Sequence, residues 1–354
     1  IGDGSQDALL VRVTADGYVG WGEAEASPLT SIASWIAPMS HSACHPVIDS
    51  VLGEPLNSPE DIFAITRKVR ANSFYAIIQS DLTLSGIEIA LWDLLGQVKE
   101  EPIYKLLGYK EATRKLPYAS VLFGDTVEET LKKATDIRKV GFSAIKFGWG
   151  HFGRGSVQDD ADHIHAAREG IGADAHLMID AGTIFHEDVE AAAARLQALS
   201  DANVLWYEEP FDAAALASYG ELSKRTPKVK LAGGEGAHNP YQAEHLIDHG
   251  GVGFVQIDTG YIGGIGDAYR VAQYAKTRGV QFVNHTFTSH SALSASLQPF
   301  AGLKDSWITE YPMEPKSLCV ELTVDKIEVE SDGMITIPDR PGIGLEINLA
   351  AVKK

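Results

Sequence analysis

Short apolar runs and longer amphipathic stretches alternate along residues 116–312. Eight apolar runs have the length and composition of strands: LPYASV, SAIKF, HLMID, VLWYE, VKLAGGE, FVQID, VQFVNH and WITE. The stretches between them, such as 126–140 and 264–279, have helical periodicity. Strand–helix alternation with short loops predicts a parallel sheet. Eight such units predict an α/β protein whose sheet closes into a modified TIM (β/α)7–8 barrel.

Residues 1–115 follow another pattern. DALLVRVT and DGYVGWGEA predict a hairpin that turns at Asp16 and Gly17, and SGIEIALWDLLGQV predicts a buried helix. Beyond Pro312, CVELTVDKIEVE and GMITIP predict extra strands that leave the barrel. We therefore expect an α+β capping domain from 1–115, a catalytic barrel from 116–312, and a tail from 313–354 that rejoins the capping domain.

Five of the apolar runs end in a residue that can bind a metal or move a proton. These residues are Asp180, Glu208, Glu235, Asp258 and His285, at intervals of 23 to 28 residues. Because the carboxyl ends of barrel strands converge on one mouth, we expect the five side chains to meet there. Several carboxylates cannot share a dry mouth unprotonated without a cation, and hard oxygen donors suit Mg2+. The first three are therefore predicted to bind Mg2+, for which Mn2+ is a possible substitute.

The other two strand ends predict an acid–base pair. A carboxylate at Asp258 that accepts from the His285 imidazole fixes its tautomer and raises its basicity. Lys146, at the end of AIKFG, is placed to hold a substrate carboxylate, or to act as a base if desolvation lowers its pKa. Glu310 ends the eighth strand and can hydrogen-bond a substrate carboxylate if it is protonated. His238 lies close enough in sequence to the third acidic strand end to reach substrate.

Glu209 follows Glu208 directly. Side chains alternate along a strand, so Glu209 is expected to point away from the mouth if Glu208 points into it. We expect Glu209 to support the ligands from behind rather than to bind the metal.

The composition of the chain disfavours some classes of binding partner. The net charge of −18 disfavours nucleic acid and anionic membranes, which select basic patches. No apolar run approaches the roughly 18 residues of a membrane span, and no signal peptide is visible. Two cysteines, far apart in the sequence, suit reduced thiols. We expect a cytoplasmic homo-oligomeric enzyme that acts on a small carboxylate.

Two other classes compete with the metal-dependent enzyme. Gly148, Gly150 and Gly153 match the G-x-G-x-x-G fingerprint of NAD-dependent oxidoreductases. However, the next helix begins with Asp159 and Asp160, whose charges would repel a pyrophosphate, so a loop at the barrel mouth is the better interpretation. A non-catalytic metal-binding or structural protein is the other alternative. Failure to exchange the α-proton of any acid would favour it.

In order and spacing, the motifs resemble those of the mandelate racemase subgroup of the enolase superfamily. The similarity runs through GWGEAEASP, SGIEIALWDLLGQ, MIDAG, WYEEP, AGGEG, VQIDTGYIGG, VNHTF and ITEYP. It implies Mg2+ on Asp180, Glu208 and Glu235, an Asp258–His285 dyad, and Glu310 near the substrate carboxylate. Known sites of this superfamily use a Lys or His base with Mg2+ to stabilise an enediolate, and the resemblance implies the same chemistry for this chain.

Two departures from the subgroup pattern change the implied reaction. Racemases of the subgroup carry K-x-K on the second strand, but here Lys146 is followed by Phe147 and Gly148. A lysine often found three residues past the dyad aspartate is replaced by Tyr261, which becomes a candidate substrate contact or acid. One face of the substrate therefore has a base and the other has none. This favours dehydration of a sugar acid by a lyase, with a racemase, epimerase or cycloisomerase as the alternative.

Overall fold

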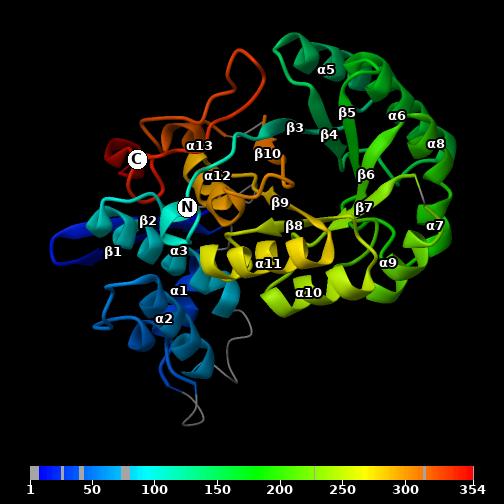
Figure 1. Ribbon diagram of the computed structural model, residues 1–354. Helices are drawn as coiled ribbons and strands as arrows, with labels where there is room; N and C mark the ends of the chain where they lie inside the picture. The colour runs from blue at the N-terminus through cyan, green and yellow to red at the C-terminus, as the bar shows by residue number, and fades with distance from the viewer. Residues whose placement is uncertain are drawn as a thin grey trace.

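The computed structural model describes residues 8–24, 28–39, 44–72, 80–226, 228–313 and 316–353. Residues 25–27 of the GWGEAEASP motif lie outside this description. Eight parallel strands form one sheet in the order β10-β3-β4-β5-β6-β7-β8-β9 (Figure 1). Their bounds are β3 (Leu116–Leu122), β4 (Ala144–Gly148), β5 (His176–Asp180), β6 (Val204–Glu208), β7 (Lys230–Gly233), β8 (Phe254–Asp258), β9 (Gln281–His285) and β10 (Ile308–Pro312). The predicted parallel barrel is thereby confirmed.

Helices link these strands and pack on the outside of the sheet (Figure 1). They are α5 (Val127–Lys139), α6 (Val157–Ile171), α7 (Val189–Ala193), α8 (Leu196–Asp201), α9 (Leu216–Ser223), α10 (Pro240–His249), α11 (Ile265–Arg278), α12 (His290–Leu297) and the 3-10 helix η2 (Gln298–Phe300). The single helix expected between β5 and β6 is broken into α7 and α8. None of the described helices is long and apolar enough to cross a membrane.

The barrel interior is a packed core rather than a channel. Each strand contributes one buried residue to it: Tyr118, Ala144, Met178, Trp206, Ala232, Phe254, Val283 and Ile308. Side chains alternate along a strand, so the residue two places further on also points inward, one layer nearer the carboxyl ends. That layer contains Ser120, Lys146, Asp180, Glu208, Gln256, His285 and Glu310. The two-residue period of the strands therefore places a layer of mostly polar side chains directly above the apolar layer.

Side chains join the two edge strands of the sheet, β9 and β10. The Asn284 side-chain oxygen accepts from the Thr309 hydroxyl at 2.5 Å and from the Glu310 amide at 2.9 Å. The amide of Thr286 donates to Glu310 Oε2 at 2.8 Å. These contacts complete a nearly closed barrel and hold Glu310 against the end of β9.

The capping domain packs an antiparallel hairpin on a long helix. Strands β1 (Leu9–Ala15) and β2 (Tyr18–Ala24) turn at Asp16 and Gly17 as predicted, and α3 (Ser80–Lys99) lies against them. Gly20 and Gly22 make this approach possible, because a Cβ on either would lie about 2 Å from a carbonyl oxygen of α3. The remaining elements are α1 (Pro28–Ile36), η1 (Val47–Ser50), α2 (Pro59–Asn72) and α4 (Ile103–Leu106).

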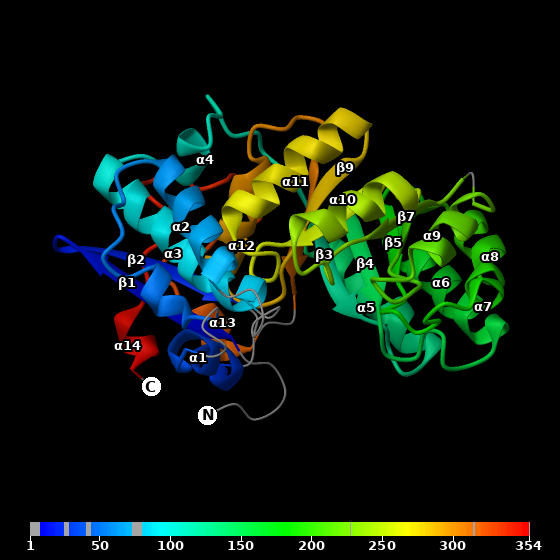
Figure 2. The same cartoon turned by 90° about the horizontal axis from the view of Figure 1, so that it is seen from below.

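The capping domain lies beside α11 and α12 of the barrel (Figure 2), and one buried carboxylate of α3 fastens the two parts together. Glu88 accepts from the backbone amides of Ile265 and Gly266, at 2.7 and 2.9 Å, where α11 begins. Trp92 Nε1 donates to the same carboxylate at 2.7 Å. Because a helix N-terminus leaves its first amides unpaired, Glu88 both caps α11 and fixes the loop that precedes it.

The expectation of extra strands in the tail was wrong. Its described residues form two short helices, α13 (Ser317–Glu321) and α14 (Leu349–Val352), and only isolated bridges such as Lys115 with Ile335. The tail backbone finds other partners: Asp93 of α3 accepts from the amide of Ile343 at 3.0 Å. Apolar alternation in the tail thus reflects packing on one side, with no ladder formed.

Lys115 is fully buried at the amino-terminal end of the barrel, directly before β3. Its charge state can be tested through the pH dependence of stability. Its ammonium donates to the carbonyls of Phe300, Leu303 and Ser306 at 2.8–3.1 Å. Burial lowers its pKa from 10.5 to about 7. A depressed lysine pKa means that its stabilising contribution is complete above the unfolded value of 10.5 and is lost as the pH falls towards 7.

We expect wild-type protein to gain stability over a Lys115→Met variant by roughly 1 kcal/mol per pH unit between pH 7 and 9. The measurement is the urea midpoint of both proteins at pH 7, 8 and 9. Lys132→Met, at an exposed lysine, serves as the control and should show a constant difference. A gap that stays constant for Lys115→Met would mean that the carbonyls keep this lysine charged throughout.

Candidate active site

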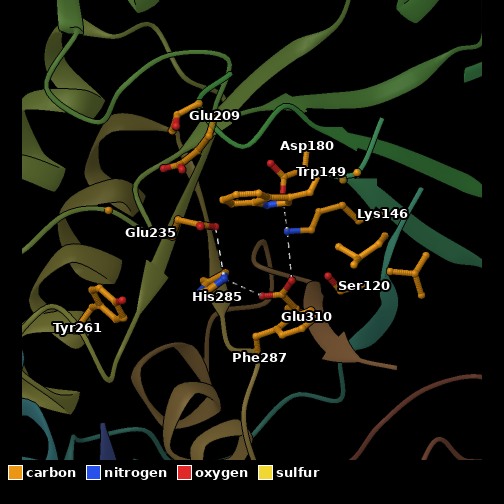
Figure 3. A pocket seen from close by; sticks show the side chains of 16 residues that line it. Ser120, Lys146, Trp149, Asp180, Glu209, Glu235, Tyr261, His285, Phe287 and Glu310 are labelled. Carbon is orange, nitrogen blue, oxygen red and sulfur yellow. Dashed lines mark ion pairs between the residues drawn. The ribbon is translucent and has the colours of Figure 1, made fainter. Parts of the chain in front are cut away.

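The carboxyl ends of the strands surround a cavity of about 700 Å³. Its lining includes most of the residues singled out in the sequence. They are Lys146, Asp180, Glu235, Tyr261, His285 and Glu310, with Ser120, Trp149, Glu209 and Phe287. Figure 3 shows the side chains of Lys146, Asp180, Glu235, His285 and Glu310 converging, with Tyr261 set apart from them. The structure therefore gathers residues from β3, β4, β5, β9, β10 and the loops after β6, β7 and β8 into one site.

Lys146 lies at the centre of the acidic groups. Its Nζ lies 2.5 Å from Glu208 Oε1, 3.1 Å from Glu310 Oε1 and 3.4 Å from Asp180 Oδ2. Burial lowers its pKa, but the charges of Glu208 and Glu310 outweigh burial and raise it well above the ordinary value. Lys146 is thus an ammonium in this state, which suits binding of a carboxylate rather than removal of a proton.

The Asp258–His285 pair has the geometry expected of an oriented base. His285 Nδ1 donates to Asp258 Oδ2 at 2.7 Å, and Asp258 Oδ1 accepts from the Gly260 amide at 2.6 Å. The other nitrogen, Nε2, faces the cavity 3.4 Å from Glu235 Oε2. Burial lowers the pKa of His285, but the charges of Glu235 and Glu310 and the contact with Asp258 raise it well above its usual range. The ring is therefore protonated beside these carboxylates, and it can act as a base only once a cation neutralises them.

The position of Glu209 differs from the expectation. Its carboxylate lines the same cavity and accepts from the amide of Gly234 at 3.2 Å. The strand ends at Glu208, and Glu209 has a φ of 36°, in the left-handed region. Strand alternation therefore no longer applies, and two consecutive glutamates face the acidic centre.

The remaining residues that the sequence singled out do not all line this cavity. Tyr261 lines the cavity, whereas His238 lines a neighbouring cavity of about 260 Å³ and stacks on the Tyr261 ring at 6.5 Å. Glu310 is placed as expected, but not in the protonated form assumed for it. Burial raises its pKa, yet Lys146 and His285 lower it further, so Glu310 is ionised here and accepts rather than donates.

Sequence reasoning missed Trp149, which directly follows the glycine in the second lysine place. Its φ is 55° and half of its surface is exposed, and its indole packs closely over Gly182. A Cβ at Gly182 would lie 2.8 Å from this ring. The signal in the sequence was the G-W-G triplet itself, because a large aromatic residue between two glycines in a mouth loop is free to face the cavity.

The site carries more negative charge than its own cations balance. Among the described residues no three His, Cys, Asp or Glu side chains stand ready as a metal ligand set, since Lys146 lies between Asp180 and Glu208. Burial raises the pKa of Glu208 to about 8, because the lowering effect of Lys146 does not offset burial and the charges of the neighbouring acids. Glu310 Oε1 also lacks a hydrogen bond of good geometry. The donor set fits a divalent cation once Lys146 turns away from the carboxylates.

Comparison with known proteins agrees with this arrangement. Residues 129–351 match the enolase C-terminal domain-like model, and residues 3–108 match the mandelate racemase / muconate lactonizing enzyme N-terminal domain. A D-galactarolactone cycloisomerase from Agrobacterium fabrum is 29% identical over 97% of this chain and 90% of its own. A D-galactonate dehydratase from Xanthomonas axonopodis pv. citri is 30% identical over 98% of this chain and 90% of its own.

Solved structures show the same fold. The crystal structure of a "predicted Mandelate racemase" from Rhodobacter sphaeroides is 55% identical, with a TM-score of 0.96 over 100% of this chain and 91% of that chain. A racemase from Streptomyces coelicolor A3(2), crystallised with bound magnesium, matches the fold with a TM-score of 0.83 at 23% identity over 98% of this chain and 91% of its own. The chain therefore belongs to the mandelate racemase / muconate lactonizing enzyme family of the enolase superfamily, as an enzyme that is either a lyase or an isomerase.

Proposed function

We propose that the protein is a Mg2+-dependent dehydratase of a sugar acid. Asp180, Glu208 and Glu235 would hold the metal, for which Mn2+ could substitute. When bound, the metal supplies a Lewis acid that stabilises negative charge growing on the substrate carboxylate. Lys146, released from Glu208, neutralises the same carboxylate from the side of β4.

In the proposed reaction the chain's own residues remove one proton from the substrate and supply one to the leaving group. His285 Nε2 takes the proton α to the carboxylate, and the C–H electron pair forms a double bond between Cα and Cβ. The bond from Cβ to its hydroxyl breaks, and a proton from a general acid turns the leaving group into water. Protonated His285 is that acid if both groups lie on its side. If they do not, Tyr261, which lines the cavity, is a better candidate than His238, which lines the neighbouring one. The enol product then tautomerises to a 2-keto-3-deoxy acid.

The observation that carries the proposal is the absence of a second base where a racemase has its lysine. A Cβ at Gly148 would lie 2.8 Å from Asp180 Cβ and 2.9 Å from its Oδ2. No larger residue therefore fits without moving a proposed metal ligand. Trp149 follows, on the Asp180 side of the cavity, while His285 lies with Glu310 on the other (Figure 3). Proton transfer on one face suits elimination better than inversion.

The charge of the cavity also favours one class of acid. Lys146 is the only Lys or Arg among the described residues that line it. Of the undescribed residues, those at 1–7, 25–27, 40–43, 73–79, 227 and 314–315 include neither residue type in their sequence, and Lys354 is the exception. A single ammonium matches a single carboxylate, so a monocarboxylic sugar acid is the preferred substrate over a diacid, whose second charge would meet Glu209 or Glu235.

A library of mono- and dicarboxylic sugar acids tests the proposal, with keto-acid product detected by semicarbazide. We expect product from one or more monoacids in the presence of Mg2+ and none from the diacids. His285→Asn protein prepared in parallel controls for contaminating enzymes. If the only reaction found is inversion at Cα or lactone isomerisation, the epimerase or cycloisomerase alternative replaces the dehydratase.

A further inference from the structure

A second and much smaller cavity lies behind the Asp258–His285 pair. Its volume is about 10 Å³, and its walls include Glu23, Asp258, Thr259 and His285. A space of this size has room for about one water molecule, provided that polar groups face it. Of these residues, Glu23 comes from β2 of the capping domain, and the others come from the barrel.

Among the described residues, no hydrogen-bond donor reaches Oε1 of the Glu23 carboxylate. The side chain is 2% exposed, and Oε2 accepts from the hydroxyl of Ser289 across 266 positions of sequence. The hydroxyl of Thr288 and the amide of Ala292 also lie near the carboxylate, but neither bonds Oε1 with hydrogen-bond geometry. Burial, with a smaller addition from the charge of Asp258, raises the pKa of Glu23.

Thr259 lines the same cavity and carries a second unpartnered atom. The Thr259 hydroxyl is buried and finds no hydrogen-bond partner within the part of the chain that the structure describes, although Thr259 directly follows the dyad aspartate. Leaving a buried polar group unsatisfied costs free energy, and a buried group that finds no protein partner is commonly satisfied by ordered water. Two unpartnered atoms, Glu23 Oε1 and Thr259 Oγ1, on residues that line one cavity of this volume are therefore consistent with a bridging water.

We propose that the cavity holds one ordered water that joins Glu23 Oε1 to Thr259 Oγ1, and that Glu23 thereby positions the Asp258–His285 pair from the capping domain. The role of that pair as the base rests on the function proposed above. The water fixes residue 259, and with it the backbone that presents Asp258 to His285. Correct docking of the β1–β2 hairpin then becomes a condition for an aligned base.

Conservative and apolar replacements separate this role from packing. Thr259→Val keeps the volume and removes the hydroxyl, whereas Thr259→Ser keeps the hydroxyl and loses a methyl. If the water matters, the valine variant should lose about 10- to 100-fold in kcat, the range typical of groups that orient a reactive side chain through an intermediary. The serine variant should stay within about threefold. Simple packing predicts the reverse order.

Glu23→Leu and Glu23→Gln form the matching pair on the other wall, with Gln expected to restore most of kcat. Each single variant and the Glu23→Leu/Thr259→Val double variant are compared for kcat, KM, Mg2+ affinity and Tm. Because both changes remove the same water, the double variant should be no worse than the poorer single one. Asp93→Asn, at a buried capping carboxylate bonded to Ile343, should lower Tm without changing kcat.

A crystal structure of the wild-type protein reads the water directly and needs no turnover. One water peak bonded to both side chains, absent from Thr259→Val, is the expected result. An empty cavity, or additive losses of Tm in the double variant, would overturn the proposal. If the wild-type enzyme removes the α-proton of no acid, only the proposed function fails. The water peak and the comparison of Tm among the single and double variants still test this inference.

Discussion

His285→Asn protein is expected to lose at least about 10²- to 10⁴-fold in the rate of α-proton exchange, the usual contribution of a positioned general base. Nε2 is the ring nitrogen that faces the cavity, and Nδ1 is committed to Asp258 at 2.7 Å. Asparagine can replace the hydrogen bond but cannot accept the proton at neutral pH. The measurement is loss of the α-proton NMR signal of a substrate acid in D2O.

Asp258→Asn should be impaired as well, because an amide facing Nδ1 no longer fixes the tautomer or stabilises the protonated ring. Both variants should keep the wild-type Tm and Mg2+ affinity. His245→Asn, in the neighbouring cavity, is the matched control and should exchange normally. Exchange by His285→Asn at a near wild-type rate would assign the base to another residue.

Glu235→Gln is expected to weaken Mg2+ binding by more than about 100-fold and to abolish turnover, since even groups behind a metal ligand contribute 10- to 100-fold. Glu235 lies beside His285, and burial and the neighbouring acids raise the pKa of Glu235. Binding a divalent cation relieves this repulsion, so loss of one carboxylate removes both a ligand and much of the attraction. Isothermal titration with MgCl2 gives the affinity directly.

Glu221→Gln, at an exposed carboxylate of α9, should bind Mg2+ as the wild type does. Excess chelator should stop the wild-type enzyme, and added Mg2+ should restore it. Undiminished turnover in chelator would show that these carboxylates serve some other purpose.

The sequence was sufficient to locate the site because barrel geometry links strand period to position. Asp180, Glu208 and His285 close their strands two residues beyond a buried Met178, Trp206 or Val283. A residue at that offset must face the mouth, whatever the details of the loops. The strand ends therefore predicted that these three side chains meet, whereas Glu235 lies in the loop two residues after β7 ends at Gly233.

Other features depend on tertiary contacts that no local pattern records. Glu209 faces the site because its backbone turns to a positive φ after the strand ends. Glu23 reaches the back of the dyad only because the hairpin docks on the barrel near Ser289. The tail resembled strands in its alternation, but its amides found partners such as Asp93 instead of a neighbouring strand.

The central claim is proton abstraction followed by loss of the β-hydroxyl. One measurement tests it most directly: 1H NMR of the active monocarboxylic sugar acid during turnover in D2O with Mg2+. The account predicts a 2-keto-3-deoxy acid that carries solvent deuterium at C3, formed by the wild type and not by His285→Asn. Deuterium at C2 of an acid that keeps all its hydroxyls, with inverted configuration and no keto acid, would contradict it.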